Sequence, residues 1–144
     1  MTGVAFCVPG KPIGKGRARA YRKGNHIGHY TPEQTVAYEA KGAAIAKLAM
    51  AGGEPFTGPV SLVIRAYLAI PKAFSRVEHQ RAVLGRRRPL SKPDFDNIEK
   101  ICADFMNGIV YADDKQIVYS SVSKFYGEIP RVEIEVAAID VDEA

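Results

Sequence analysis

The sequence predicts a single α+β domain, in which helices pack against one mixed β-sheet and the elements follow the order β-α-β-α-β-β. The length of 144 residues suits one domain and leaves little room for a second. Apolar residues make up 47% of the chain and charged residues 25%, ordinary globular values that argue against disorder. Stretches typical of strands are interspersed with two stretches of helical periodicity, which together predict the α+β class. Residues 1–144 are therefore expected to form one domain.

The first half of the chain predicts a strand, a loop, a helix and a second strand. The short apolar stretch 4–8 predicts the strand, and the basic, glycine-rich stretch 10–31 predicts a loop or a weak hairpin. Thr31 and Pro32 suit an N-cap and a first helical position, so a helix should begin there and end near residue 50. Residues 60–70 alternate and predict the second strand. The helical stripe expected on this first helix comprises Val36, Ala40, Ala43, Ala44, Lys47 and Leu48.

The second half predicts a loop, a helix and two further strands. The arginine-rich stretch 73–92 shows no helical or strand period and is expected to be a loop. A helix is expected over residues 95–107, followed by two strands at 116–126 and 131–139 that a turn joins as a hairpin. One buried face of this helix is predicted from apolar residues at helical spacing, namely Ile98, Ile101, Cys102, Phe105 and Met106.

Composition excludes several classes of protein. No apolar run approaches the roughly 20 residues that span a bilayer. The first residues lack the pattern of a signal peptide, and the cysteines, Cys7 and Cys102, are too few for a disulfide framework or a zinc site. A cytoplasmic protein without a membrane partner is expected.

Basic residues are concentrated in two segments of a chain whose net charge is +4. Residues 1–32 contain no acid, and residues 73–92 contain Glu78 alone. Two basic segments beside a balanced body favour a polyanionic partner. Solvated loop charge explains the same composition about equally well.

Acidic residues that could carry chemistry cluster at the start of the second helix. Asp94 and Asp96 flank Phe95, so their carboxylates could converge while Phe95 turns to the core. Lys100 follows Asp96 by four residues and shares its helix face. A purely structural interpretation also fits, because carboxylates stabilise a helix N-terminus and an i,i+4 pair stabilises the helix.

The adjacent pair Asp113 and Asp114 favours a metal site over that structural interpretation. If the chain returns beside the helix, three or four carboxylates come together as hard oxygen ligands, which suit Mg²⁺ or Mn²⁺. Such a cation relieves their mutual repulsion and acts as a Lewis acid in phosphodiester chemistry. The predicted metal ligands are Asp94, Asp96, Asp113 and Asp114.

These residues resemble the RusA-type Holliday junction resolvases (crossover junction endodeoxyribonucleases), which prophages often encode. The motif Asp-x-Asp-Asn-x-x-Lys at residues 94–100 and the motif Asp-Asp-x-Gln at 113–116 carry the likeness, which extends to the segments 10–19 and 130–134. The resemblance implies that Asp94, Asp96 and Asp114 are the catalytic metal-binding acids, Lys100 the catalytic lysine and Asp113 a supporting acid. It also implies a Mg²⁺-dependent homodimer that cuts four-way DNA junctions in recombination and repair.

The DNA contacts are expected in the two basic segments. The chain departs from the family at Arg17-Ala18-Arg19, where many members have Arg-Pro-Arg, and in the long stretch 73–92. Tyr21 and Tyr30 could stack on bases or sugars, and packing is as plausible a role. The predicted DNA-binding residues are Lys11, Lys15, Arg17, Arg19, Arg86, Arg87 and Arg88.

Two other functions compete with the nuclease interpretation. One is a non-catalytic nucleic-acid-binding module whose acids are structural, and the other is a metal-dependent enzyme that acts on nucleotides. The two basic segments count against a small substrate. Apolar residues near the acids, namely Val110, Tyr111, Ile117 and Val118, are expected to support the dimer.

Overall fold

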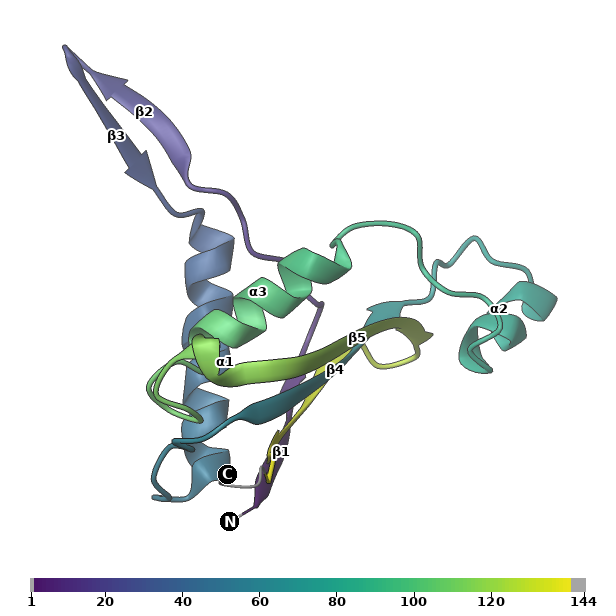
Figure 1. Cartoon of the computed structure of the whole chain (residues 1–144). Coiled ribbons are helices and arrows are strands. Elements are labelled where there is room, and N and C mark those ends of the chain that lie inside the picture. The colour runs from purple at the N-terminus through teal and green to yellow at the C-terminus, as the bar shows by residue number, and fades with distance from the viewer. Residues whose placement is uncertain (1, 141–144) are drawn as a thin grey trace.

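The computed structural model describes residues 2–140, which form a sheet with helices on one face (Figure 1). The sheet has four strands in the order β1 (Gly3–Pro9), β6 (Arg131–Ala138), β4 (Val60–Ala69) and β5 (Ile117–Gly127). β6 pairs antiparallel with both β1 and β4, whereas β4 and β5 are parallel. The predicted single α+β domain with a mixed sheet is therefore confirmed.

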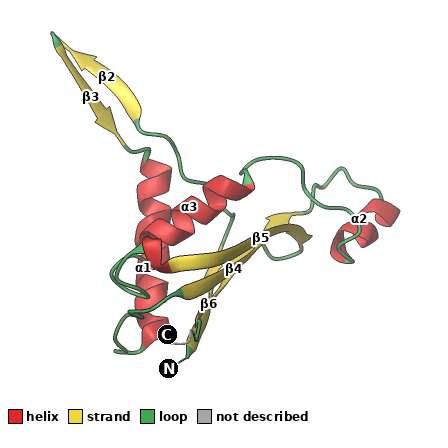
Figure 2. Cartoon of the chain, viewed as in Figure 1, coloured by secondary structure: helices red, strands yellow, loops and turns green. Residues whose placement is uncertain are grey.

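The core lies between the sheet and two helices, α1 (Glu33–Met50) and α3 (Phe95–Phe105) (Figure 2). Alternate residues of β4 face the helices and are fully buried, as the period of two in a strand requires. The apolar face predicted for α3 is confirmed, because all of its members are buried, namely Ile98, Ile101, Cys102, Phe105 and Met106. No helix of the described residues is both long enough and apolar enough to span a membrane.

The stripe predicted for α1 is wrong. Val36 and Leu48 are 54% and 81% exposed, and the buried face is instead made of small and polar-tipped residues. Gly42 explains why this face of α1 is buried, because the Phe105 ring of α3 lies where a Cβ atom at Gly42 would be, only 2.5 Å from it. The helix also begins after Pro32, which occupies the N-cap position predicted for Thr31, and no side chain caps it. Its buried residues are Thr35, Tyr38, Gly42, Ala46 and Met50.

The hairpin predicted between the last two strands is also wrong. β5 and β6 are not neighbours, since β4 lies between them in the sheet. The turn after β5 therefore carries the chain past β4 to the gap between β4 and β1. Turn residues indicated the reversal correctly, but the partner of each strand depends on the parallel pairing of β4 with β5, which the local sequence does not encode.

Two excursions from the sheet and helices add elements that the predicted order lacks (Figure 1). β2 (Arg19–Lys23) and β3 (His26–Tyr30) form an antiparallel hairpin, hereafter the ribbon, which projects beyond the N-terminal end of α1. The segment 73–92, hereafter the arm, contains α2 (Arg76–Val83). The prediction of a loop there is wrong because Ser75 caps a helix, its side chain accepting a hydrogen bond from the Glu78 N–H.

Candidate active site

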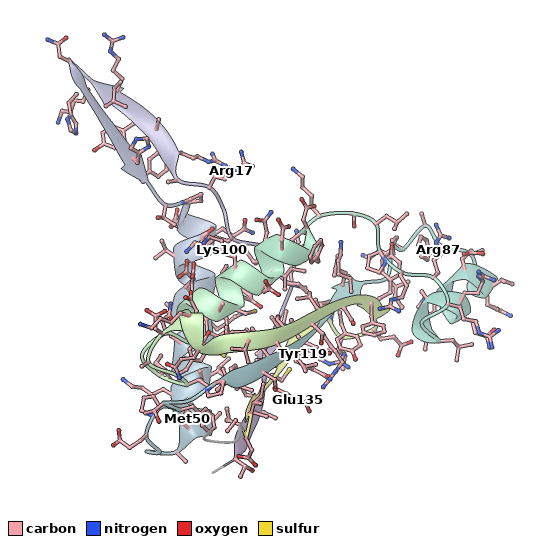
Figure 3. All side chains as sticks on the ribbon, viewed as in Figure 1. Arg17, Met50, Arg87, Lys100, Tyr119 and Glu135 are labelled. Atoms are coloured by element: carbon pink, nitrogen blue, oxygen red, sulfur yellow. The ribbon has the colours of Figure 1, made fainter. Side chains whose placement is uncertain are left out.

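A hollow of about 610 Å³ lies between α3 and the start of β5, and it gathers three of the predicted site residues. Asp96 and Lys100 reach it from α3, and Asp114 reaches it from the turn before β5. Figure 3 labels Lys100 on α3 and Tyr119, which also lines the hollow, on β5. We call this site the acidic hollow; its polar and charged lining comprises Asp96, Asn97, Glu99, Lys100, Asp104, Asp114, Tyr119 and Ser120.

The first two turns of α3 place Asp96 and Lys100 on one face. The carboxylate of Asp96 accepts a hydrogen bond from the Asn97 N–H at 3.0 Å, where the positive end of the helix dipole favours a negative charge. Lys100 is exposed, and within residues 2–140 it takes part in no ion pair. Its ammonium group therefore remains available to an anion that enters the acidic hollow.

A short 3₁₀ turn, η1 (Asp114–Gln116), places Asp114. Asp113 caps this turn, since its carboxylate accepts a hydrogen bond from the Lys115 N–H at 2.9 Å and its own N–H donates to Gln116 Oε1 at 3.0 Å. Gln116 Nε2 in turn donates to the backbone oxygens of Phe56 and Gly58. Asp113 and Gln116 therefore hold the backbone that carries Asp114. The Asp-x-x-Gln spacing, which is typical of a capping box, is the sequence signal that indicates this role.

Tyr111 fixes the turn to α3 from below. Its side chain is fully buried, and its hydroxyl donates to the Ala103 carbonyl oxygen at 2.6 Å. Burial raises the pKa of Tyr111 well above its ordinary value, and the nearby negative charge of Asp114 raises it further. Tyr111 therefore stays a neutral hydrogen-bond donor and holds the segment before η1 against α3.

Asp94 stands at the start of α3, two residues before Asp96. It occupies the N-cap position of α3 and lines a second hollow, together with Arg17 and Lys92. The expectation that Phe95 turns to the core is wrong, because Phe95 is 62% exposed and the core begins only at Ile98. Asp96 lines the acidic hollow and Asp94 lines the second hollow, and Asn97 lines both, so the two hollows adjoin at the start of α3.

Two further acids of the acidic hollow have protein partners. Glu99 accepts a hydrogen bond from the Ser120 hydroxyl at 2.6 Å. Asp104 pairs with the ammonium of Lys15 at 3.1 Å, and Glu39 pairs with the same group at 2.7 Å. Burial lowers the pKa of Lys15, but the hydrogen bonds to Glu39 and Asp104 outweigh it and leave the pKa raised. Lys15, predicted to bind DNA, thus links α1 to α3, and its ammonium offsets part of the negative charge of Glu39 and Asp104.

The acids with no such partner fit a divalent cation. Within the described residues, no group of three or more histidine, cysteine, aspartate or glutamate side chains is placed to hold a metal by itself. Mg²⁺ does not require such a cage, because it is usually bound through one or two carboxylates while water and substrate phosphates complete its six ligands. Asp96 and Asp114, on opposite sides of one open hollow, have this chemistry.

The predicted DNA-binding residues differ in how they are engaged. Lys11, Arg17 and Arg19 are exposed at or below the base of the ribbon, where Figure 3 labels Arg17. Arg86 is exposed in the arm. Two other residues of the set are held by the arm and its surroundings, namely Arg87, which pairs with Glu78, and Arg88, which lies over the Phe125 ring.

Comparison with known proteins bears on both the fold and the acidic hollow. The family model for endodeoxyribonuclease RusA matches residues 9–137. The chain is also 33% identical to the Bacillus subtilis (strain 168) protein YqaN over 144 residues, which cover 96% of this chain and 99% of YqaN. The match of residues 9–137 includes Asp94, Asp96, Lys100 and Asp114 and all of the predicted DNA-binding residues.

Proposed function

We propose that this chain resolves four-way (Holliday) DNA junctions, and the premise is that it belongs to the RusA family of endodeoxyribonucleases. The observation that carries the proposal is that Asp96, Lys100 and Asp114 line one hollow. Asp96 and Lys100 belong to α3, whereas Asp114 belongs to η1, a separate element. Such cutting serves DNA recombination and repair. The alternative of a non-catalytic binding module gives no reason for a lysine that lines the same hollow as two aspartates and takes part in no ion pair within residues 2–140.

The cofactor we propose is Mg²⁺, with Mn²⁺ as a substitute, held by Asp96 and Asp114. Asp94 is proposed as the third acid, because it lies two residues from Asp96 at the same helix start, and Asp113 supports Asp114 through the capped turn. A bound divalent ion would supply a Lewis acid for the phosphodiester and lower the pKa of a water molecule.

The residues of the acidic hollow have separate roles in the hydrolysis. A water oxygen forms a bond to phosphorus and the bond from phosphorus to the 3′ oxygen breaks, which leaves a 5′-phosphate and a 3′-hydroxyl. The ammonium of Lys100 stabilises the negative charge that develops on the phosphoryl oxygens. The carboxylates orient the attacking water and accept its proton. The ion pair of Lys15 with Asp104 reduces the repulsion between Asp104 and the phosphate.

A four-way junction has two opposed strands to cut, and an isologous dimer presents one site to each. We therefore propose a homodimer. Two residues expected to support it cannot do so, because Val110 and Tyr111 are fully buried within the chain. Val118 and Tyr119 beside the acidic hollow are 63% and 59% exposed and remain available. Heterodimers of wild-type and Asp96→Asn chains should nick a cruciform plasmid to open circles instead of linearising it.

The experiment that tests the function measures Mg²⁺-dependent cleavage of a labelled four-way junction, with a linear duplex of the same sequence beside it. The wild-type chain should cut the junction and spare the duplex. Asp96→Asn should lose cleavage and keep junction binding, since phosphate affinity comes from lysine and arginine side chains. Glu54→Gln, an exposed acid outside the hollow, is the matched control and should cut normally. Normal cleavage by Asp96→Asn would overturn the site.

A further inference from the structure

The ribbon has no core of its own. Its strands pair from Arg19 with Tyr30 to Lys23 with His26, and of their residues only Gly28 is buried. A two-stranded hairpin exposed on both faces is marginally stable in water. Figure 1 shows the ribbon projecting away from the sheet, in contact with the body only through its base. A segment so built suits contact with a partner more than support of the fold.

One face of the ribbon is aromatic. Tyr21 pairs with Gly28, and a Cβ atom at Gly28 would lie 2.3 Å from the Tyr21 ring, so the ring lies directly on the glycine backbone. The rings of Tyr30 and His26 follow with centroids 6.2 and 6.4 Å from that of Tyr21. Tyr21 and Tyr30 are 46% and 47% exposed, so rings supported from behind present a surface to the solvent.

The same face is basic. Residues opposite each other in an antiparallel pair share a face, so Arg19 and Lys23 stand beside Tyr30 and His26. No acidic residue occurs in residues 1–32, and within the described chain no ion pair involves the cations of the ribbon. Aromatic rings with unpaired cations between them are the combination that binds single-stranded nucleic acid.

The base of the ribbon is tied to the acidic hollow. The Lys15 N–H donates to the carbonyl oxygen of Asn97 at 2.8 Å, and Asn97 lines the hollow beside Asp96. The Gly16 N–H donates to Thr35 Oγ1 at 3.1 Å, which ties the next residue to α1. A DNA strand bound by the ribbon is therefore bound next to the acidic hollow.

We infer that the aromatic face of the ribbon binds unpaired nucleotides at the branch point of the DNA, with Tyr21 and Tyr30 stacking on bases and Arg19 and Lys23 contacting phosphates. The inference rests on the proposed function and supplies a reason for branch selectivity. Within a duplex both faces of each base are covered by its neighbours, so tyrosine rings can stack only where bases are unpaired or the helix ends.

The test measures equilibrium binding without divalent ions, by fluorescence anisotropy, to an oligothymidylate strand and to a linear duplex. Tyr30→Leu and Tyr21→Leu should each weaken binding to the single strand by roughly fivefold or more, the low end for loss of a base–aromatic stack. Duplex binding should change by less than about twofold. Leucine keeps an apolar side chain over Gly28, which protects the ribbon fold, and Tyr21→Phe keeps the ring and should bind as wild type.

Ile27→Ala is the matched control, because Ile27 is 64% exposed on the opposite face of the ribbon. It should leave binding to the single strand unchanged. Equal losses on single strand and duplex, or unchanged binding in both leucine variants, would overturn the inference. A four-way junction with 5-iodouracil at its branch point should crosslink under ultraviolet light to the peptide that contains Tyr21 or Tyr30, and a crosslink confined to other peptides would also overturn it. None of these measurements involves cleavage, so a chain that fails to cut junctions can still pass them.

Discussion

The ribbon and the arm are both basic and both lie outside the sheet, yet their cations are engaged differently. In the arm, Arg87 pairs with Glu78 at 2.6 Å and its guanidinium carbon lies 4.0 Å from the centroid of the Phe74 ring. Arg88 lies 3.8 Å from the centroid of the Phe125 ring and donates to the Lys124 carbonyl oxygen. In the ribbon, Arg22 makes one hydrogen bond, to the backbone oxygen of Gly24.

The difference teaches that equal charge in a sequence does not mean equal availability to DNA. The arm fixes itself to the end of the sheet through a stack in which Arg88 covers Phe125, Phe125 lies on Tyr67, and Arg131 covers Tyr67 from the other side. Cations that make such cation–π contacts stabilise the arm. Within residues 2–140, the cations of the ribbon take part in no ion pair, so they can instead neutralise phosphates.

Removal of the ribbon cations should have the largest effect on the salt dependence of DNA binding. In the double variant Arg19→Ala, Lys23→Ala, the log–log slope of affinity against salt should fall by about 1.8, because each lost phosphate contact removes about 0.9. Titrations of duplex and junction at several salt concentrations measure the slope. An unchanged slope would show that the ribbon does not touch DNA.

A triple variant of the arm, Arg86→Ala, Arg87→Ala, Arg88→Ala, should have a smaller effect. Only Arg86 lacks a partner in the described structure, so the slope should fall by about 0.9. The fold should instead lose stability, by about 0.5 to 1 kcal/mol for each cation–π contact removed. Urea unfolding of Arg88→Ala beside Arg86→Ala isolates that loss. A fall in slope as large as in the ribbon variant would erase the distinction between the two regions.

Lys15→Met should have the smallest effect on the salt dependence, although Lys15 belongs to the same basic segment as the ribbon. Its ammonium is held by Glu39 and Asp104, so the slope should stay constant while the free energy of unfolding falls by about 1 to 2 kcal/mol. Since the pKa of Lys15 is raised above 10.5, this stabilisation is present below that pH and is lost as the pH rises through the raised value. Lys11→Met is the exposed control, and a change in slope at Lys15 equal to that at Lys11 would contradict the pairing.

The parts of the fold with strong local signals could be predicted from the sequence. The face of α3 followed from large apolar residues at helical spacing, and the motif with Asp96 and Lys100 fixed two members of the acidic hollow. The buried face of α1 could not be predicted in the same way. It depends on Gly42 admitting Phe105, a contact between residues far apart in the sequence.

Contacts outside the local sequence also limit what could be predicted at the candidate site. Phe95 was expected to turn to the core because it is apolar, but the first turn of α3 lies outside the core and leaves Phe95 exposed. The pairing of Lys15 with Asp104 and the stacking of Arg88 on Phe125 join distant segments, so composition could not show that these two predicted DNA-binding residues have protein partners. The spacing of Asp113 to Gln116 is that of a capping box, a local signal from which the capping role of Asp113 could be predicted.

The most direct test of the central claim is the single-turnover rate of four-way junction cleavage by Asp114→Asn in Mg²⁺, measured with its affinity for the same junction. Asp114 lines the acidic hollow because the capped turn η1 places it there. The effect of its substitution on cleavage therefore tests the whole hollow and not the motif of α3 alone. We predict that cleavage is lost, that junction affinity stays within about twofold of wild type because the phosphate contacts remain, and that Lys115→Ala in the same turn cuts normally. Cleavage by Asp114→Asn at the wild-type rate would contradict the claim that Asp96, Lys100 and Asp114 form one active site.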